Sequence, residues 1–356
     1  MLSQGGCVIT RTLMSDLPSR YSRQILFPGL GKKGQDRLIQ SRVVIVGCGA
    51  LGTVQAESLC RAGVGNLLIV DRDFIEESNL QRQVLFTEQD MRESIPKAVA
   101  AKRRLEQINS LVRVEAQVTD VNYRNVESLV AGADCILDGT DNFESRYLLN
   151  DVSQKHQIPW VYGGVVGSKG LTMTIVPGKT PCLRCVFESP PSPGTTPTCD
   201  TAGVLSPAIN VIASLQVAET FKILTGKIKQ INRKLLCVDI WQNTWQFLAT
   251  EASEKRADCP TCHSATFDFL DGQKGSSVTS LCGRNSVQIN QIERQHLNLP
   301  QLAQRLQLLG SVSCNQFFLR FKLKKIEIAV FPDGRAIIRG TRDQQVARSL
   351  YSRYIG

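Results

Sequence analysis

The chain has 356 residues, of which 42% are hydrophobic and 21% charged, so it can form one large domain and a small one. Its net charge of +10 is unevenly distributed along the chain, because residues 281–356 hold 12 Lys and Arg against 4 Asp and Glu. This composition excludes a disordered or fibrous chain, and no apolar run approaches the roughly 20 residues of a membrane-spanning helix. The N-terminal segment lacks the apolar block of a signal peptide, so we expect a cytoplasmic protein without a membrane partner. Residues 1–19 show no periodic pattern and are predicted to be a flexible extension.

Short runs of Val, Ile and Leu alternate with helical patterns through the first half of the chain. In chain order, the predicted elements are a strand at 42–47, a helix at 53–63, a strand at 66–71, a helix at 96–108 and strands at 112–118 and 133–140. Apolar strands that alternate with helices are typical of a parallel sheet covered on both faces. We therefore predict an α/β fold with a Rossmann-like doubly wound sheet.

After Pro159 the pattern changes to strands that follow one another more closely. The segments 159–167, 170–178 and 234–250 are predicted to extend the same sheet as antiparallel strands, which would make it mixed. A helix at 206–226 separates them and ends at a glycine. The loop 186–200 is rich in Pro, Ser and Thr, and long loops of this kind are functional or disordered.

The C-terminal part of the chain is predicted to be a separate small unit. Residues 265–280 contain DGQKGSS and are interpreted as a linker that follows a main domain over 20–264. Beyond the linker, 281–356 is predicted to be a basic α+β domain with a helix at 299–310. Strands in 315–340 are expected to meet at the turn Asp333-Gly334.

A glycine loop follows the first predicted strand directly. Gly47, Gly49 and Gly52 form G-x-G-x-x-G between a strand and a helix, which lets backbone N–H groups approach phosphate oxygens. Asp71 ends the next strand, at the spacing of an acid that binds a ribose. The pattern predicts a nucleotide site without naming the nucleotide. The alternative is a glycine turn that only joins strand to helix.

Charged residues after Asp71 favour one nucleotide class over another. Arg82 lies in a polar stretch, and Lys97 opens a helix directly after Pro96. Asp138 and Asp141 follow a strand at the carboxyl edge of the sheet, where ligands bind in such folds. A carboxylate with Arg and Lys nearby suits a magnesium triphosphate better than a nicotinamide.

The 12 cysteines include two CxxC pairs and one cysteine on the predicted loop. The pairs are Cys182 with Cys185 and Cys259 with Cys262, and four thiolates from two tight turns are typical of a structural zinc site. A redox role for either pair is the alternative. Cys199 ends the Pro-rich loop shortly before a helix, so it is either a nucleophile or an ordinary loop cysteine.

Several short motifs occur together in a characteristic order. They are RYSRQ at 20–24, GCGALG, DRD, SNLQRQ, Pro96-Lys97, DGTDN, the two CxxC pairs and CDTAGVLSP. In this order the chain resembles the E1-like adenylyltransferases of sulfur carrier proteins, the ThiF/MoeB/HesA family. The resemblance covers about residues 19–264. The part after Cys282 does not resemble the rhodanese domain that some relatives carry.

The resemblance implies a role for each matched residue. Asp71 would bind the ribose of ATP, Arg82 and Lys97 its phosphates, and Asp141 the Mg²⁺ ion, while Asp73 and Asn79 fall in matched nucleotide-binding motifs. Arg23 matches the arginine that one subunit of a homodimer lends to its partner's ATP. Cys199 matches the crossover-loop cysteine that some members link covalently to the carrier. Cys182, Cys185, Cys259 and Cys262 match the zinc ligands.

The implied reaction is adenylylation of the Gly-Gly carboxylate of a ubiquitin-like sulfur carrier, for thiamine or molybdopterin synthesis. A cysteine desulfurase or a rhodanese would then donate sulfur. A carboxylate is already a nucleophile at neutral pH, so alignment and cations can carry the catalysis. Three alternatives stay open: an NAD-dependent dehydrogenase, the same chemistry for tRNA thiolation with RNA on the basic tail, and a tail that steers an acidic carrier.

Overall fold

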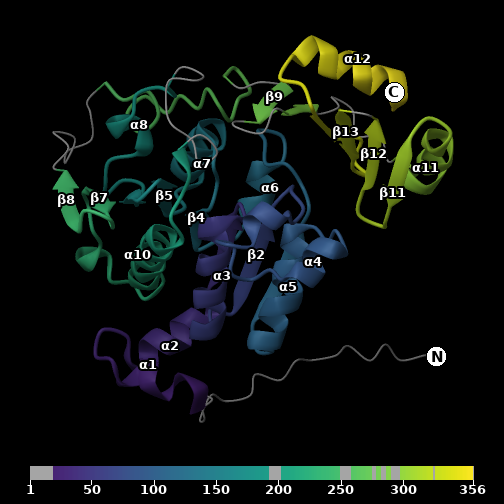
Figure 1. Ribbon diagram of the computed structural model, residues 1–356. Coiled ribbons are helices and arrows are strands. Elements are labelled where there is room, and N and C mark those ends of the chain that lie inside the picture. Colours follow the sequence, from purple (N-terminus) through teal and green to yellow (C-terminus); the bar gives the residue numbers. More distant parts are fainter. Residues whose placement is uncertain are drawn as a thin grey trace, which may run out of the picture.

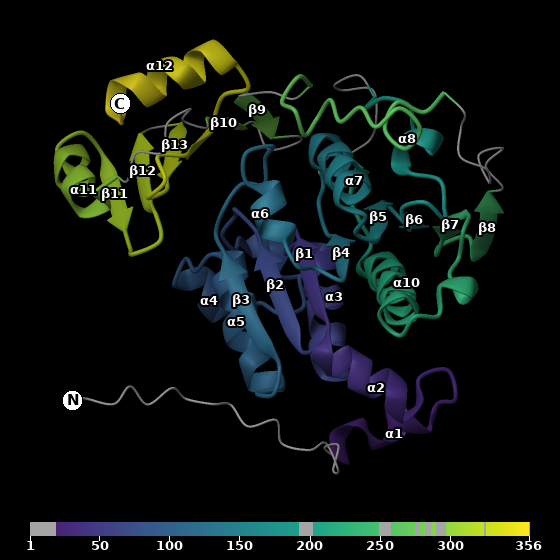
Figure 2. The ribbon, with the colours of Figure 1, turned by 180° about the vertical axis from the view of Figure 1, so that it is seen from behind.

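The computed structural model describes residues 19–191, 202–248, 258–274, 278–281, 286–289, 297–323 and 325–355. Two β-sheets organise these residues, one of eight strands and one of six. In the described part of the chain, no helix has the length and apolar character needed to cross a bilayer. The smaller sheet and its helices, here called the C-terminal module, lie beside one edge of the larger sheet (Figures 1 and 2).

The large sheet is mixed, as predicted. Its strands are β1 (Arg42–Val46), β2 (Asn66–Val70), β3 (Arg113–Gln117), β4 (Cys135–Asp138), β5 (Trp160–Val166), β6 (Lys169–Ile175), β7 (Leu235–Asp239) and β8 (Thr244–Leu248). Their order is β3-β2-β1-β4-β5-β6-β7-β8. The first five strands run parallel to their neighbours, and β6, β7 and β8 pair antiparallel. This confirms the Rossmann-like α/β fold, since parallel neighbours need helical crossovers whereas β5 and β6 are joined by a short turn.

Helices cover both faces of the large sheet. They are α1 (Ser22–Leu26), α2 (Gly31–Gln40), α3 (Ala50–Ala62), α4 (Glu88–Arg92), α5 (Lys97–Ile108), α6 (Val126–Val130), α7 (Phe143–His156), α8 (Leu183–Val186) and α10 (Ser206–Leu224), with 3₁₀ turns η1 (Ser19–Tyr21), η2 (Glu77–Asn79) and η3 (Ile228–Gln230). Alternate residues of β1 enter different cores. Val43 and Ile45 pack under α3, α5 and α10, whereas Val44 and Val46 pack under α6 and α7. Because both faces of the sheet are covered, successive residues of these strands are all buried, which explains their continuous apolar sequences.

The C-terminal module is an antiparallel sheet with two helices. Its elements are β9 (Val278–Leu281), β10 (Ser286–Ile289), α11 (Leu299–Gln307), β11 (Ser311–Cys314), β12 (Leu319–Leu323), β13 (Ile326–Val330), β14 (Ala336–Arg339) and α12 (Gln344–Tyr354). The strand order is β11-β12-β13-β14-β10-β9. The predicted turn joins β13 to β14, with Gly334 at a φ of 82°. The module is therefore α+β, as predicted, and it contains one further helix, α12, that the sequence pattern did not predict.

The segment interpreted as a linker begins inside the large domain. Phe269 and Leu270 are buried in the core under α7, and the carboxylate of Asp151 accepts the Phe269 N–H at 3.0 Å. Residues 265–274 therefore pack as part of the body that holds α7. The exact domain boundaries stay a prediction.

Candidate active site

The glycine loop joins β1 to α3 at the carboxyl end of the sheet. Gly47 has a φ of 89°, and a Cβ there would lie 2.5 Å from the Gly139 carbonyl oxygen. A Cβ on Gly52 would lie 2.0 Å from the Gly47 oxygen, so both positions require glycine. At Gly49 a Cβ would meet only Gln83 Nε2, at 3.8 Å. The middle glycine is thus the open one, where a ligand can approach the backbone.

Asp71 connects this loop to the segment that follows β2. Its carboxylate accepts the N–H of Cys48 at 2.6 Å and the N–H of Asp73 at 2.7 Å. Burial raises the pKa of Asp71, an effect that the nearby ammonium of Lys97 opposes. Asp71 therefore fixes the two backbone segments on either side of the expected ribose position.

Lys97, at the start of α5, is buried and paired. Its ammonium lies 3.3 Å from the Asp73 carboxylate, and its side chain is 3% exposed. The Lys97 backbone N–H donates to the Asp73 carbonyl oxygen, and Phe74 forms a β-bridge with Pro96. These bonds align the segment after Asp71 with the start of α5. The structure thus brings Asp71, Asp73, Lys97 and the glycine loop together.

Two arginines at the carboxyl end of the large sheet were not identified from the sequence as candidate site residues. Arg146 of α7 forms an ion pair of 3.3 Å with the buried Asp138 and donates to the Thr140 carbonyl oxygen. Arg72 pairs with Asp120 at 2.6 Å, and the pKa of Arg72 is raised by Asp120, Asp73 and Asp141 against the effect of burial. Their signal was present, since Arg72 lies between two acids in DRD and Arg146 follows DGTDN within one helical turn.

The remaining predicted nucleotide residues differ in exposure. Asp141 is exposed beyond the end of β4. Arg82 is half-buried, and its guanidinium donates to the Ser78 carbonyl oxygen at 2.6 Å. Asn79 is 1% exposed, and its Nδ2 has no acceptor among the described residues. A buried donor of this kind is satisfied by an added acceptor, which fits a bound nucleotide.

Arg23 lies far from the glycine loop of its own chain. It is an exposed residue of α1, whose Gln24 side chain donates to the carbonyl oxygen of Ala62 at the other end of α3. Figure 1 shows α1 and α2 at the end of the molecule opposite the C-terminal module. Within one chain the structure therefore does not bring Arg23 to the site. Cys199 lies outside the described residues.

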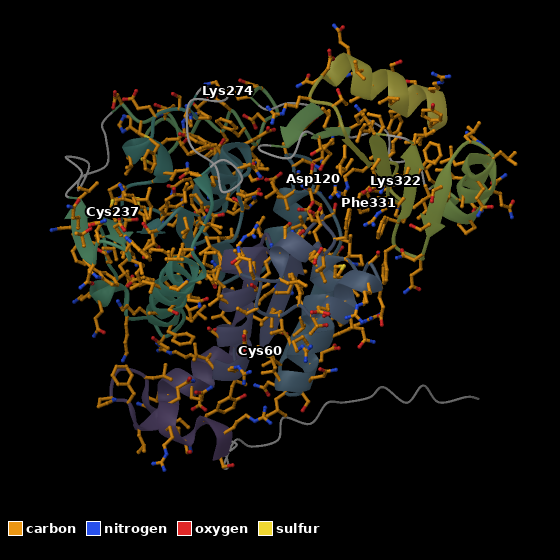
Figure 3. All side chains as sticks on the ribbon, in the orientation of Figure 1. Cys60, Asp120, Cys237, Lys274, Lys322 and Phe331 are labelled. Carbon is orange, nitrogen blue, oxygen red and sulfur yellow. The ribbon has the colours of Figure 1, made fainter. Side chains whose placement is uncertain are left out.

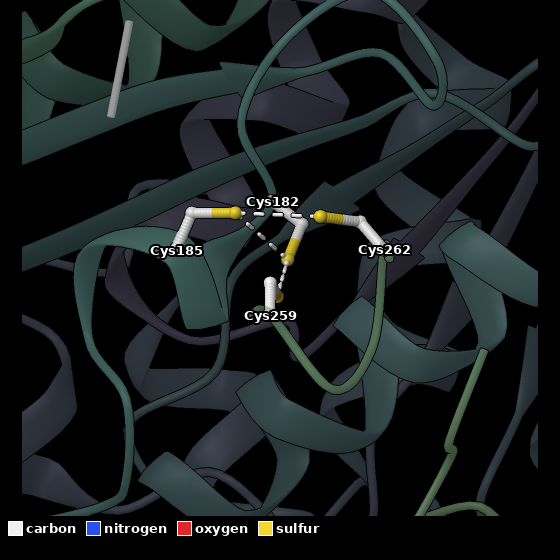
Figure 4. Close-up of side chains that lie close together, drawn as sticks. All are labelled: Cys182, Cys185, Cys259 and Cys262. Carbon is white, nitrogen blue, oxygen red and sulfur yellow. Dashed lines mark hydrogen bonds between the residues drawn. The ribbon is translucent and has the colours of Figure 1, made fainter. Parts of the chain in front are cut away.

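The four predicted zinc ligands converge in space. The sulfur atoms of Cys182, Cys185, Cys259 and Cys262 all lie within 4.8 Å of one another (Figure 4). Neighbouring sulfurs are 3.4 to 3.8 Å apart, and tetrahedral Zn²⁺ with Zn–S bonds of about 2.3 Å needs about 3.8 Å. The donor set and spacing fit a closed structural zinc site that joins α8 to residues 258–263.

Comparisons with known proteins agree with this geometry. The family model described as the ThiF family matches residues 21–261. The sulfur carrier protein ThiS adenylyltransferase of Bacillus subtilis is 44% identical over 341 residues, which cover 96% of this chain and 100% of the relative. The SAMP-activating enzyme E1 of Haloferax volcanii is 38% identical over 74% of this chain and 95% of its own length. The crystal structure of E. coli MccB with ATP aligns with a TM-score of 0.59 and 26% identity, covering 68% of this chain and 74% of that one.

Proposed function

Since the chain belongs to the ThiF family of E1-like adenylyltransferases, we propose that it uses Mg-ATP to adenylylate the C-terminal Gly-Gly carboxylate of a ubiquitin-like sulfur carrier. The carrier would be the one that serves thiamine synthesis. One observation supports this pathway above the others. The Bacillus relative that is named for ThiS matches 96% of this chain, and the match therefore extends into the C-terminal module.

The proposed roles follow from the site. ATP would lie over Gly49, with its ribose at Asp71 and its phosphates near Lys97 and Arg82. The buried donor of Asn79 would satisfy an acceptor of the nucleotide. Asp141 would hold Mg²⁺, because it is an exposed carboxylate next to a cationic edge.

The proposed reaction needs no general base among these residues. A carboxylate oxygen of the carrier attacks the α-phosphorus, the bond to the β-phosphate oxygen breaks, and pyrophosphate leaves. Lys97 would stabilise negative charge as it develops on the phosphates, because its ammonium is held in place before the ligand arrives. The acyl-adenylate would then be consumed by a sulfur donor, a cysteine desulfurase or a rhodanese.

Three further elements of the proposal rest on the sequence. Arg23 would act in the site of a partner subunit, which requires a homodimer. The Cys199 thiol would attack the carbonyl carbon of the acyl-adenylate, so that AMP leaves and a thioester links the carrier to the enzyme before the sulfur donor acts. The cytoplasm would be the location. Replacement of Cys199 by Ala should then retain pyrophosphate exchange and abolish sulfur transfer.

ATP–pyrophosphate exchange tests the proposal. The purified protein is mixed with Mg-ATP, labelled pyrophosphate and each candidate Gly-Gly-tailed carrier. Exchange should appear with the thiamine carrier and disappear when the carrier lacks its last glycine. Tight binding of NADH without binding of Mg-ATP would support the dehydrogenase alternative instead. Faster exchange with a carrier that serves tRNA thiolation would move the proposal to that pathway.

A further inference from the structure

The C-terminal module contacts the large domain next to the nucleotide site. The ring of Phe74, three residues after Asp71, is 3% exposed and lies in an apolar cluster with Phe318, Phe331 and two further residues of the module. The rings of Phe74 and Phe318 stack at a centroid distance of 5.0 Å with an interplanar angle of 9°. The guanidinium of Arg339 also lies 4.9 Å from the Phe74 centroid. Without the module, this aromatic ring would face water.

Polar contacts from the module reach the backbone on both sides of the site. Arg335 donates from Nη2 to the Arg72 carbonyl oxygen at 3.0 Å. Asn315 donates from Nδ2 to the Ser94 carbonyl oxygen at 3.3 Å, three residues before Lys97. The first bond holds the segment that follows Asp71, and the second holds the segment that leads into α5. Both segments carry residues of the proposed nucleotide site.

A third contact reaches the side chain of Arg72. Gln288 of β10 donates to Asp120 at 2.6 Å, and the other oxygen of Asp120 pairs with Arg72 at 2.6 Å. Figure 3 shows Asp120 of the large domain and Phe331 of the module in the region where the two parts meet, which is here called the junction. A side chain of the module is therefore linked through two bonds to the cation between Asp71 and Asp73.

Arg335 is a costly residue to place at such a junction. Its side chain is 3% exposed, and its Nε and Nη1 have no hydrogen-bond acceptor among the described residues. The nearest carboxylate oxygen, of Asp333, lies 3.9 Å from Nε, and the guanidinium lies 3.7 Å from the centroid of the Phe331 ring. Buried polar groups without partners destabilise a fold, and an apolar side chain of similar length would pack here with less cost. Its hydrogen bond to the Arg72 carbonyl oxygen ties it to the segment that follows Asp71.

We propose that the C-terminal module positions the nucleotide site, with Arg335 and Gln288 as positioning residues that hold residues 72–76 in the geometry that binds ATP. This inference rests on the proposed function, because it takes Asp71, Asp73 and Lys97 to contact ATP. By holding residues 72–76 in place beforehand, the module reduces the conformational entropy that this segment loses when the nucleotide binds. Its removal would weaken nucleotide binding while the chemical step stays intact.

The test compares Arg335→Met with Arg353→Met in the full-length chain. Arg353 is an exposed residue of α12 in the same module, so its variant carries the same chemical change away from the junction. The KM for ATP and the Kd of Mg-ATP should rise about three- to tenfold in Arg335→Met, which corresponds to one lost hydrogen bond. The kcat should stay within about twofold, because the chemistry is unchanged. Arg353→Met should match the wild type.

Two further readouts separate positioning from a structural role. The midpoint of thermal unfolding should stay close to that of the wild type in Arg335→Met, because the lost contacts with Arg72, Phe331 and Asp333 are offset by removal of a buried charge with two unbonded nitrogens. Amide hydrogen exchange of residues 72–76 should become faster in the nucleotide-free variant. Gln288→Leu should shift the KM for ATP in the same direction. Wild-type affinity for Mg-ATP in both junction variants would overturn the inference.

The outcomes distinguish this inference from the proposed function. If no carrier supports exchange but Arg335→Met still weakens Mg-ATP binding, the proposed function fails and the positioning role stands. If exchange occurs and both junction variants bind Mg-ATP like the wild type, the function stands and the positioning role fails. A wild-type chain that binds no nucleotide would end both.

Discussion

The ammonium of Lys97 lies 3.3 Å from the Asp73 carboxylate, and the Lys97 backbone N–H donates to the carbonyl oxygen of the same residue at 2.9 Å. A buried lysine keeps its charge only when it is paired. Asp73 therefore stabilises a positive charge at the site before any ligand is bound. A charge that is already in position stabilises the transition state most effectively, because no side chain has to reorient during the reaction.

Replacement of Lys97 by Met should abolish most of the activity. We expect kcat/KM for pyrophosphate exchange to fall at least about 100-fold, because the proposed role of Lys97 is to stabilise negative charge on the phosphates. Lys102→Met is the matched control, since Lys102 is on the same helix with a 41% exposed side chain. The control should keep its rate within about twofold. A Lys97 variant that retains its rate would show that the ammonium has no part in the reaction.

Asp141→Asn tests the proposed magnesium ligand. Asp141 is exposed, so the substitution should leave the unfolding free energy within about 0.5 kcal/mol. Exchange should be lost at millimolar Mg²⁺, because an amide is a poorer ligand for a hard cation. Asp271→Asn, an exposed control that carries the same chemical change outside the proposed nucleotide site, should behave as the wild type. Equal Mg²⁺ dependence in both variants would remove Asp141 from the metal site.

Cys182→Ser should release zinc and destabilise the protein. The four sulfurs form one closed cluster, so loss of a ligand removes metal-binding free energy that also supports folding. Metal analysis should find about one zinc ion per chain in the wild type and much less in the variant. Cys237→Ser, a half-buried position on β7, is the control and should keep its metal. A metal-free wild type of normal stability would favour the redox alternative.

Asp151 should make stability fall as the pH rises through the acid range. Burial raises the pKa of Asp151 to about 6, against the opposing hydrogen bond from Phe269. The folded state thus binds the proton more tightly than the unfolded chain, with its pKa of about 3.9. The contribution is fully present below about pH 4 and is lost as the pH rises to about 6, about 3 kcal/mol in total.

Asp151→Asn removes this titration and provides the comparison. Urea unfolding of the variant should show a smaller loss of stability between pH 4 and pH 6 than the wild type shows. The two proteins should differ least at pH 4, where the wild-type carboxyl is protonated and resembles an amide. Parallel curves for both proteins across this range would contradict the raised pKa.

The sequence predicted the large sheet because each of its signals is local. Around Gly47, a strand, a glycine loop and a helix follow one another without interruption. The two CxxC pairs are recognised by their spacing alone. Local patterns of this kind do not depend on the rest of the fold. The predicted cluster of four cysteines was therefore correct even though the pairs are 77 positions apart.

The parts that were missed depend on contacts between distant segments. Phe269 and Leu270 were read as linker because their neighbours are polar, and only the fold shows that Asp151 binds this backbone. Phe74 and Phe318 lie 244 positions apart, so no spacing rule links them. Arg335 looked like one more residue of a basic surface, whereas it is buried against Arg72. Tertiary packing between segments that are distant in the sequence decides each of these cases.

Mass spectrometry of the carrier tests the central claim most directly. The candidate thiamine carrier is incubated with the protein and Mg-ATP in the absence of a sulfur donor, and its intact mass is measured at once. We predict a species heavier by one AMP less one water, absent without ATP and absent when the terminal glycine is removed. An unchanged carrier mass under conditions where the protein binds Mg-ATP would contradict adenylylation of that carboxylate.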